Sequence, residues 1–300
     1  MNRVKGYLFI ACAATLWGAS ATLVKYLFNA QFHPLIIIQT RVSIAFVLLF
    51  FYFITTNPRI LKFRIRDVPL FFFVGVCGVA GSNYFYYFAI KESNVATAIV
   101  VQYSAPIMVA LYAIVVQHER MTKFKFLALI FSSLGIFLAV GGLNGLLVAN
   151  SKGILFALVA AVSYAIFNIA GKPLIEKYTV WPSLVFSLGA ATLFWMVIQT
   201  PQTILAANYS FRDWQVFALV STTSILIPYS LYFLGLHFLT PTSAIITSTL
   251  EPVVAIVTAF VFLGGSMGTL QTVGAVFVIG SIILLETSSE PTIETQNQQR

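Results

Sequence analysis

Glu251 and Arg41 are ionisable residues that lie within long apolar stretches of the chain. A charge inside a membrane costs several kcal/mol, so such residues are functional candidates. The Glu251 carboxylate suits a substrate amine or a transported proton, and the Arg41 guanidinium suits a carboxylate or phosphate held by two parallel hydrogen bonds. The structural alternatives are a carboxylate that pairs with backbone groups freed by Pro252, and an arginine that pairs with another helix or extends to the membrane surface.

Two prolines interrupt apolar stretches at similar depths. Pro106 and Pro252 stand 146 residues apart. Proline lacks a backbone N–H and clashes with the preceding helical turn, so we expect a kink at each position. Two kinked helices that meet near the midplane of a membrane would form a plausible substrate site.

Polar aromatic and amide side chains recur at helical spacing in the same stretches. Asn83 and Tyr87 are four residues apart, and Tyr229 and Tyr232 are three apart. Hydroxyl and amide groups in lipid need partners, so these side chains should face inward, where they either stack on a substrate or join helices. The predicted substrate-binding residues are Trp17, Arg41, Asn83, Tyr87, Gln102, Tyr103, Tyr164, Asn168, Tyr229, Tyr232 and Glu251.

The composition is that of an integral membrane protein. Charged residues are 9% of the 300 residues, hydrophobic residues are 59%, and the mean hydropathy is +0.91. Soluble proteins carry about 25% charged residues, so this chain has too few to cover a soluble fold. A helical span needs about 20 apolar residues. Ten such stretches predict an all-α protein with ten transmembrane helices, at 5–28, 34–55, 68–90, 94–117, 122–141, 153–171, 181–199, 212–236, 241–263 and 268–285.

The positive charges predict the orientation in the cytoplasmic (inner) membrane. If the N-terminus is cytoplasmic, twelve of the 17 Lys and Arg residues lie inside and three lie outside, and the remaining two are within spans. Cytoplasmic loops are enriched in Lys and Arg, so both termini are predicted to be cytoplasmic. The same distribution explains the net charge of +8 without a nucleic-acid partner. Residues 287–300 are predicted to be a disordered cytoplasmic tail.

The two halves of the chain repeat each other. Ala98 and Pro106 recur 146 residues later as Ala244 and Pro252, and Trp17 corresponds to Tyr164 with a shift of one residue. The repeats are predicted at 1–143 and 150–286. Five spans in each repeat require the second to be inverted, an arrangement typical of secondary transporters.

Several motifs together resemble the EamA-type branch of the drug/metabolite transporter superfamily. They are Leu16-Trp17-Gly18, Arg41, Ser93-Asn94, Ala96-Thr97-Ala98 leading to Pro106, Glu119-Arg120 and Glu251-Pro252. The resemblance covers about residues 5–286 and implies ten helices, a central cavity, and export or uptake of small metabolites, with amino acids among the frequent cargoes. The second repeat departs from the first because Gly264-Gly265 replaces the Glu-Arg pair.

The predicted function is that of a secondary transporter, not an enzyme, that moves an amino acid or a related compound by alternating access. Proton coupling and exchange both remain open. A nucleoside-like, S-adenosyl-type or sugar-type metabolite is the alternative cargo. A channel or a membrane-embedded enzyme is a remote alternative, since the sequence contains no filter loop and no cluster of catalytic or metal-binding residues. The predicted partners are the substrate and the lipid bilayer, with no cofactor or metal, and the chain is expected to be a monomer or homodimer.

Overall fold

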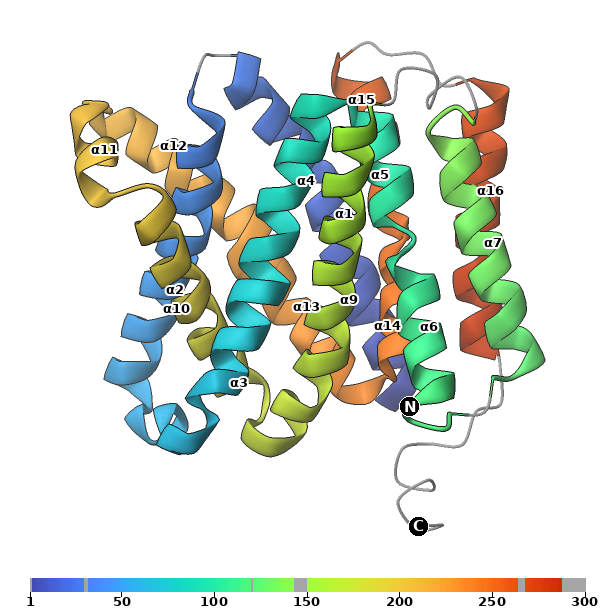
Figure 1. The fold of residues 1–300 in the computed structure, drawn as a ribbon, viewed down its shortest axis with the longest axis horizontal. Coiled ribbons are helices and arrows are strands. Elements are labelled where there is room, and N and C mark those ends of the chain that lie inside the picture. The colour runs from blue at the N-terminus through green and yellow to red at the C-terminus, as the bar shows by residue number, and fades with distance from the viewer. Residues whose placement is uncertain (1, 30–31, 120, 143–149, 264–267, 288–300) are drawn as a thin grey trace.

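The described part of the chain folds into a bundle of helices that run between two ends of the molecule (Figure 1). The structure is a computed structural model, and it describes residues 2–29, 32–119, 121–142, 150–263 and 268–287. Arg120, Gly264-Gly265 and the predicted tail beyond Thr287 lie outside these residues. The first-half elements are α1 (Asn2–Asn29), α2 (Pro34–Thr56), η1 (Pro58–Leu61), η2 (Ile65–Asp67), α3 (Val68–Phe72), η3 (Phe73–Ala80), α4 (Gly81–Glu92), α5 (Val95–Gln102), α6 (Ala105–Val115) and α7 (Lys123–Ala139). The second-half elements are α9 (Ser151–Tyr178), α10 (Val180–Ile198), α11 (Pro201–Ala206), α12 (Phe211–Ser221), η4 (Thr222–Leu226), α13 (Ile227–Phe238), α14 (Pro241–Ser248), α15 (Leu250–Leu263) and α16 (Thr269–Thr287).

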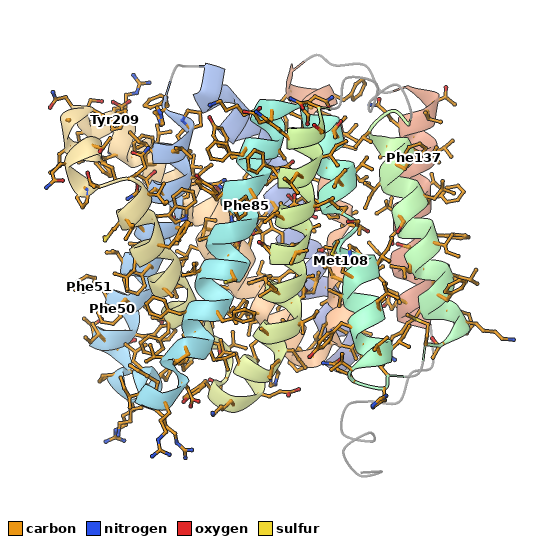
Figure 2. The ribbon with its side chains drawn as sticks, in the orientation of Figure 1. Phe50, Phe51, Phe85, Met108, Phe137 and Tyr209 are labelled. Carbon is orange, nitrogen blue, oxygen red and sulfur yellow. The ribbon has the colours of Figure 1, made fainter. Side chains whose placement is uncertain are left out.

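The predicted all-α membrane fold is confirmed. Among the described residues, nine helical stretches are long and apolar enough to cross a membrane. The remaining predicted span, 122–141, is present as α7, which has 17 residues and packs against α16. Side chains such as Phe51, which is 60% exposed, point outward from the bundle (Figure 2), as expected where lipid replaces water.

The two halves run in opposite directions. The α1 helix starts at the lower end of the bundle in Figure 1, whereas α9 starts at the upper end and finishes at the lower one. The α16 helix also ends at the lower end, close to where α1 begins. Two five-span halves of the same order but opposite direction make an inverted repeat.

Each half packs against the other rather than forming a core of its own. The α1 helix packs on α13 and α15 of the second half, and α9 packs on α4 and α5 of the first. The α2 and α10 helices also face each other. Gly18 permits the close approach of α1, because a Cβ there would lie 2.8 Å from the Cβ of Val254 on α15. The first helix of each repeat therefore brings its side chains to the centre of the other.

Spans 4 and 9 are each broken into two helices at equivalent positions. The first break separates α5 from α6 at Tyr103 and Ser104, and Pro106 is the second residue of α6. The second break separates α14 from α15 at Thr249, and Pro252 is the third residue of α15. A proline cannot donate to the carbonyl four residues before it, so each break occurs where the helical hydrogen bonding is already interrupted.

Spans 3 and 8 contain π-helical segments, η3 and η4, that also occupy equivalent positions. In both spans a polar side chain donates back to a carbonyl at the end of the π segment. The amide of Asn83 donates to the Val79 carbonyl at 2.8 Å, and the hydroxyl of Ser230 donates to the Leu226 carbonyl at 2.6 Å. Single π turns inside α-helices are frequent at functional sites, and here they precede the residues of the candidate site.

We predict that α7 and α16 tolerate no side chain at their contact. A Cβ at Gly135 would lie 2.8 Å from the carbonyl oxygen of Gly274, and a Cβ at Gly274 would meet the backbone of Gly135 and Ala139. Gly274→Ala should lower the free energy of unfolding by about 1–3 kcal/mol, as overpacking does, measured by thermal unfolding in detergent. Gly280→Ala is the matched control in the same helix, since a Cβ there meets no atom within 4 Å. Equal stability of the two variants would contradict the prediction.

Candidate substrate site

Nine of the eleven predicted binding residues form one connected network between the two halves. They come from α1 (Trp17), α2 (Arg41), α4 (Asn83), the break between α5 and α6 (Tyr103), α9 (Tyr164, Asn168), α13 (Tyr229, Tyr232) and α15 (Glu251). The inverted repeat explains why these nine residues meet. A residue near the middle of a span stays near the middle of the membrane when the span is inverted.

The acidic end of the network joins the two broken helices. The hydroxyl of Tyr103 donates to Oε2 of Glu251 at 2.8 Å, so the break in span 4 contacts the restart of span 9. Beside it, the hydroxyl of Tyr164 donates to Oγ of Ser248 at 2.8 Å, just before the break in span 9. The Tyr103 and Tyr164 rings meet edge to face at 6.2 Å. Both tyrosines are buried, which places the Glu251 carboxylate in the interior of the bundle.

The basic end is organised by Asn83. Its Oδ1 accepts from Nη2 of Arg41 at 3.2 Å, and its Nδ2 donates to the carbonyl of Val79 and, at 3.3 Å, to the hydroxyl of Tyr229. The Arg41 backbone is held separately, because its carbonyl accepts from the hydroxyl of Ser221 at 2.6 Å. The Nε of Arg41 is buried and has no acceptor among the described residues. Asn83 therefore orients the guanidinium but leaves part of it unpaired.

Aromatic rings connect the two ends. Trp17 lies 5.2 Å from the Tyr229 ring and 5.3 Å from the Tyr232 ring, and its indole N–H donates to the Ser224 carbonyl at 3.0 Å. The hydroxyl of Tyr232 donates to Oδ1 of Asn168, whose Nδ2 donates to the Tyr164 carbonyl at 2.8 Å. These hydrogen bonds fix the orientation of the Trp17 and Tyr232 rings in this conformation.

Two residues of the site were not predicted. Phe167 packs against Tyr164, Tyr229 and Tyr232 with ring centroids 5.4–6.3 Å apart. Its spacing of three residues from Tyr164 on the same helix was the available signal. Ser248 accepts from Tyr164, and it could have been found as the residue that corresponds to Gln102 at the repeat offset of 146.

The other two predicted residues are Tyr87, which packs against the core cluster that contains Tyr229 and Tyr232, and Gln102. The Tyr87 ring lies one helical turn beyond Asn83 and packs against Phe88 at 5.5 Å. Gln102 is the last residue of α5, and its amide makes no hydrogen bond with any described residue. Its neighbour Tyr103 reaches Glu251 instead, because the helix ends between them and changes the direction of the next side chain.

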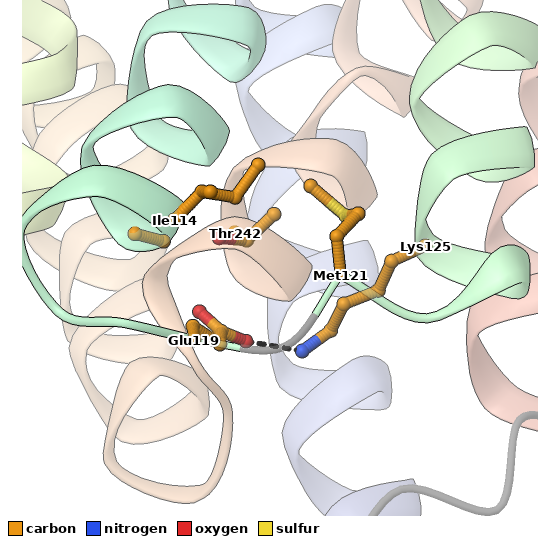
Figure 3. Close-up of a pocket in the computed structure, with 6 residues that line it drawn as sticks. Ile114, Glu119, Met121, Lys125 and Thr242 are labelled. Carbon is orange, nitrogen blue, oxygen red and sulfur yellow. Dashed lines mark hydrogen bonds and ion pairs between the residues drawn. The ribbon is translucent and has the colours of Figure 1, made fainter.

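A second polar cluster lies at the lower end of the bundle, away from this network. Glu119 and Lys125 form an ion pair whose side chains are 11% and 4% exposed (Figure 3). They line a small space with Ala113, Ile114, Met121 and Thr242, between the α6–α7 link and the start of α14. The pair neutralises its own charges, which is the arrangement of a structural contact between span ends.

We predict that the Tyr103 hydroxyl stabilises the contact between the two broken helices. Tyr103→Phe removes the bond to Glu251 and should lower the free energy of unfolding by about 0.6–1.7 kcal/mol, the upper half of what interhelical hydrogen bonds contribute in membranes. Thermal unfolding of the purified protein in detergent measures the change. Tyr52→Phe is the control, because the Tyr52 side chain is 60% exposed. If both variants unfold like the unmodified protein, the Tyr103 bond contributes nothing to stability.

Comparisons with known proteins agree with this architecture. An uncharacterized transporter of Archaeoglobus fulgidus is 30% identical over 176 residues, which are 58% of this chain and 60% of that protein. The threonine/homoserine exporter RhtA of Escherichia coli K12 is 26% identical over 97% of this chain and 92% of its own length. A protein crystal structure shares the fold with a TM-score of 0.75 and 16% sequence identity, over 93% of this chain and 96% of that one. The EamA-like transporter family model matches residues 4–141 and again 151–287, so the chain belongs to the EamA-like transporter family.

Proposed function

We propose that this transporter moves an amino acid or a related small metabolite across the cytoplasmic membrane by alternating access. The observation that carries the proposal is the hydrogen bond between Tyr103 and Glu251, which joins the two broken helices of opposite repeats. Broken helices at the interface of inverted repeats are where secondary transporters bind substrate. Movement of one half against the other would break and re-form this bond, and a substrate would take part in that exchange.

One relative supports the proposed cargo class. RhtA is named as a threonine/homoserine exporter and aligns over nearly the whole chain. An amino acid is therefore the first candidate, and a nucleoside-like, S-adenosyl-type or sugar-type metabolite is the second. Glu251 carries either a proton or the amine of the substrate, and the corresponding mechanisms are proton coupling and exchange.

The proposed orientation places both termini in the cytoplasm. Arg59, Lys62, Arg64 and Arg66 are in the link between α2 and α3, at the same end of the bundle as the start of α1. Lys62, Arg64 and Arg66 are exposed, and such cations mark cytoplasmic loops. The repeats are assigned to 1–143 and 150–286, and the transporter is proposed to act as a monomer or homodimer without a cofactor or a nucleic-acid partner.

Replacement of Glu251 should impair transport. Glu251→Gln removes the charge but keeps the size of the side chain, and loss of a charged hydrogen bond corresponds to about a 10-fold or larger reduction. Uptake of radiolabelled L-threonine and L-homoserine into proteoliposomes at several pH values measures the effect. Glu286→Gln is the control, since Glu286 is exposed near the end of α16. Full transport by Glu251→Gln with an unchanged pH dependence would rule out a role in substrate or proton binding.

Thiol labelling in intact cells tests the orientation. Cys12 and Cys77 are replaced by alanine, and a single cysteine is then introduced at Lys62 or at Gln202, both of which are exposed in links between spans. A membrane-impermeant maleimide should label the cysteine at position 202 in intact cells and the cysteine at position 62 only after permeabilisation. The opposite pattern would invert the proposed topology.

A further inference from the structure

Most hydrogen-bond donors in the network already have acceptors within the protein. The hydroxyls of Tyr103, Tyr164 and Tyr232 donate to Glu251, Ser248 and Asn168 respectively. The Trp17 indole donates to a backbone carbonyl. A substrate therefore cannot recruit these donor hydrogens without breaking a bond between helices. The groups that remain open are the ones that should select the substrate.

Open donors lie at the basic end. The Nε–H of Arg41 is buried and has no acceptor among the described residues. The Tyr229 hydroxyl accepts from Asn83 at 3.3 Å, but its own hydrogen has no acceptor among those residues. A buried donor without an acceptor costs free energy, which an anion would recover. A guanidinium beside a hydroxyl is suited to a carboxylate, which accepts several hydrogen bonds at once.

An open acceptor lies at the acidic end. Glu251 accepts from Tyr103 through Oε2, and its Oε1 has no hydrogen-bond partner among the described residues. An ammonium group has three donors and no acceptor, so it matches a carboxylate oxygen with unused lone pairs. The Trp17, Tyr229 and Tyr232 rings lie between the two ends, and such rings also attract cations.

The two ends carry opposite charges that are not paired directly. Arg41 and Glu251 interact electrostatically, but the described residues include no ion pair between them. Opposite charges that remain separate within a membrane protein are best compensated by a ligand with both charges. A neutral sugar or nucleoside would bring no charge to either Arg41 or Glu251, which would then have only their mutual attraction.

We propose that the site binds a zwitterionic amino acid by both of its charged groups, with the carboxylate on Arg41 and Tyr229 and the ammonium on Glu251. Asn83 is a positioning residue, because it holds the guanidinium of Arg41 and has its own amide engaged with Val79 and Tyr229. The inference rests on the proposed function and refines its substrate class. Binding of this kind requires an amino acid whose carboxylate and ammonium groups are both unmodified.

Binding to the unmodified protein is the first test and needs no variant. Calorimetric titration in detergent with the twenty protein amino acids and L-homoserine identifies the best-binding amino acid. The amide and the N-acetyl derivative of that amino acid are then titrated. Each derivative should bind about 10-fold more weakly or worse, because each removes one charged interaction.

Variants assign each charged group to its partner. Arg41→Gln should bind the acid and its amide equally, while it still prefers the free amine over the N-acetyl derivative. Glu251→Gln should show the opposite pattern. Asn83→Ala should reduce the preference for the acid over the amide, a ratio that a loss of general stability would not change. Lys152→Gln, at an exposed cation near the start of α9, should leave both ratios unchanged.

The outcomes separate this inference from the proposed function. If amino acids bind but their amides and N-acetyl derivatives bind as tightly, the two-ended site is wrong and amino-acid transport still stands. If no amino acid binds, both the proposed cargo class and the inference are wrong. If Arg41→Gln removes the preference for a free amine instead, the assignment of the two ends is reversed and the proposal is overturned.

Discussion

A polar group inside this bundle is costly unless it finds a partner, and the rest of the structure follows from that constraint. In lipid an unpaired backbone or side-chain polar group costs several kcal/mol. Pro106 and Pro252 each remove one backbone donor from a span, and both helices break beside them. The breaks bring Tyr103 and Glu251 into a hydrogen bond that spans both repeats. The polar network is therefore the consequence of two interrupted helices that meet in an apolar environment.

The helices of the two halves are arranged symmetrically, but the charged side chains that they carry differ. Breaks, π segments and packing partners recur in both halves. The residue before Pro252 is Glu251, whereas the residue before Pro106 is Ala105. The acidic group is thus supplied by the second half and the basic group, Arg41, by the first. Symmetry gives two similar halves, which the proposed alternating access requires. The unequal side chains would give a charged ligand one preferred orientation in the proposed site.

Much of this architecture could be predicted from the sequence because a membrane imposes simple rules. Apolar stretches of about 20 residues mark spans, and the recurrence of Pro106 as Pro252 reveals the repeat. Nine of the eleven residues predicted to bind substrate meet in one network, and their role in binding stays a prediction. Gln102 makes no hydrogen bond with another described residue, because α5 ends at this residue and the side chain of Tyr103 reaches Glu251. Phe167 was missed because residue type alone does not mark an apolar ring in an apolar helix, and its three-residue spacing from Tyr164 was the only signal.

The sequence by itself determined the class of protein, the number and order of its spans, the family and the residues that are too polar for lipid. Hydropathy and residue type are local properties, so they can be read from the sequence without a structure. The tertiary structure alone decided which polar groups pair. It paired Tyr103 with Glu251 and Asn83 with Arg41, and it left Nε of Arg41 and Oε1 of Glu251 without a hydrogen-bond partner among the described residues. Those pairings depend on helix directions and on close approaches such as that of Gly18 to α15, which join residues far apart in the chain.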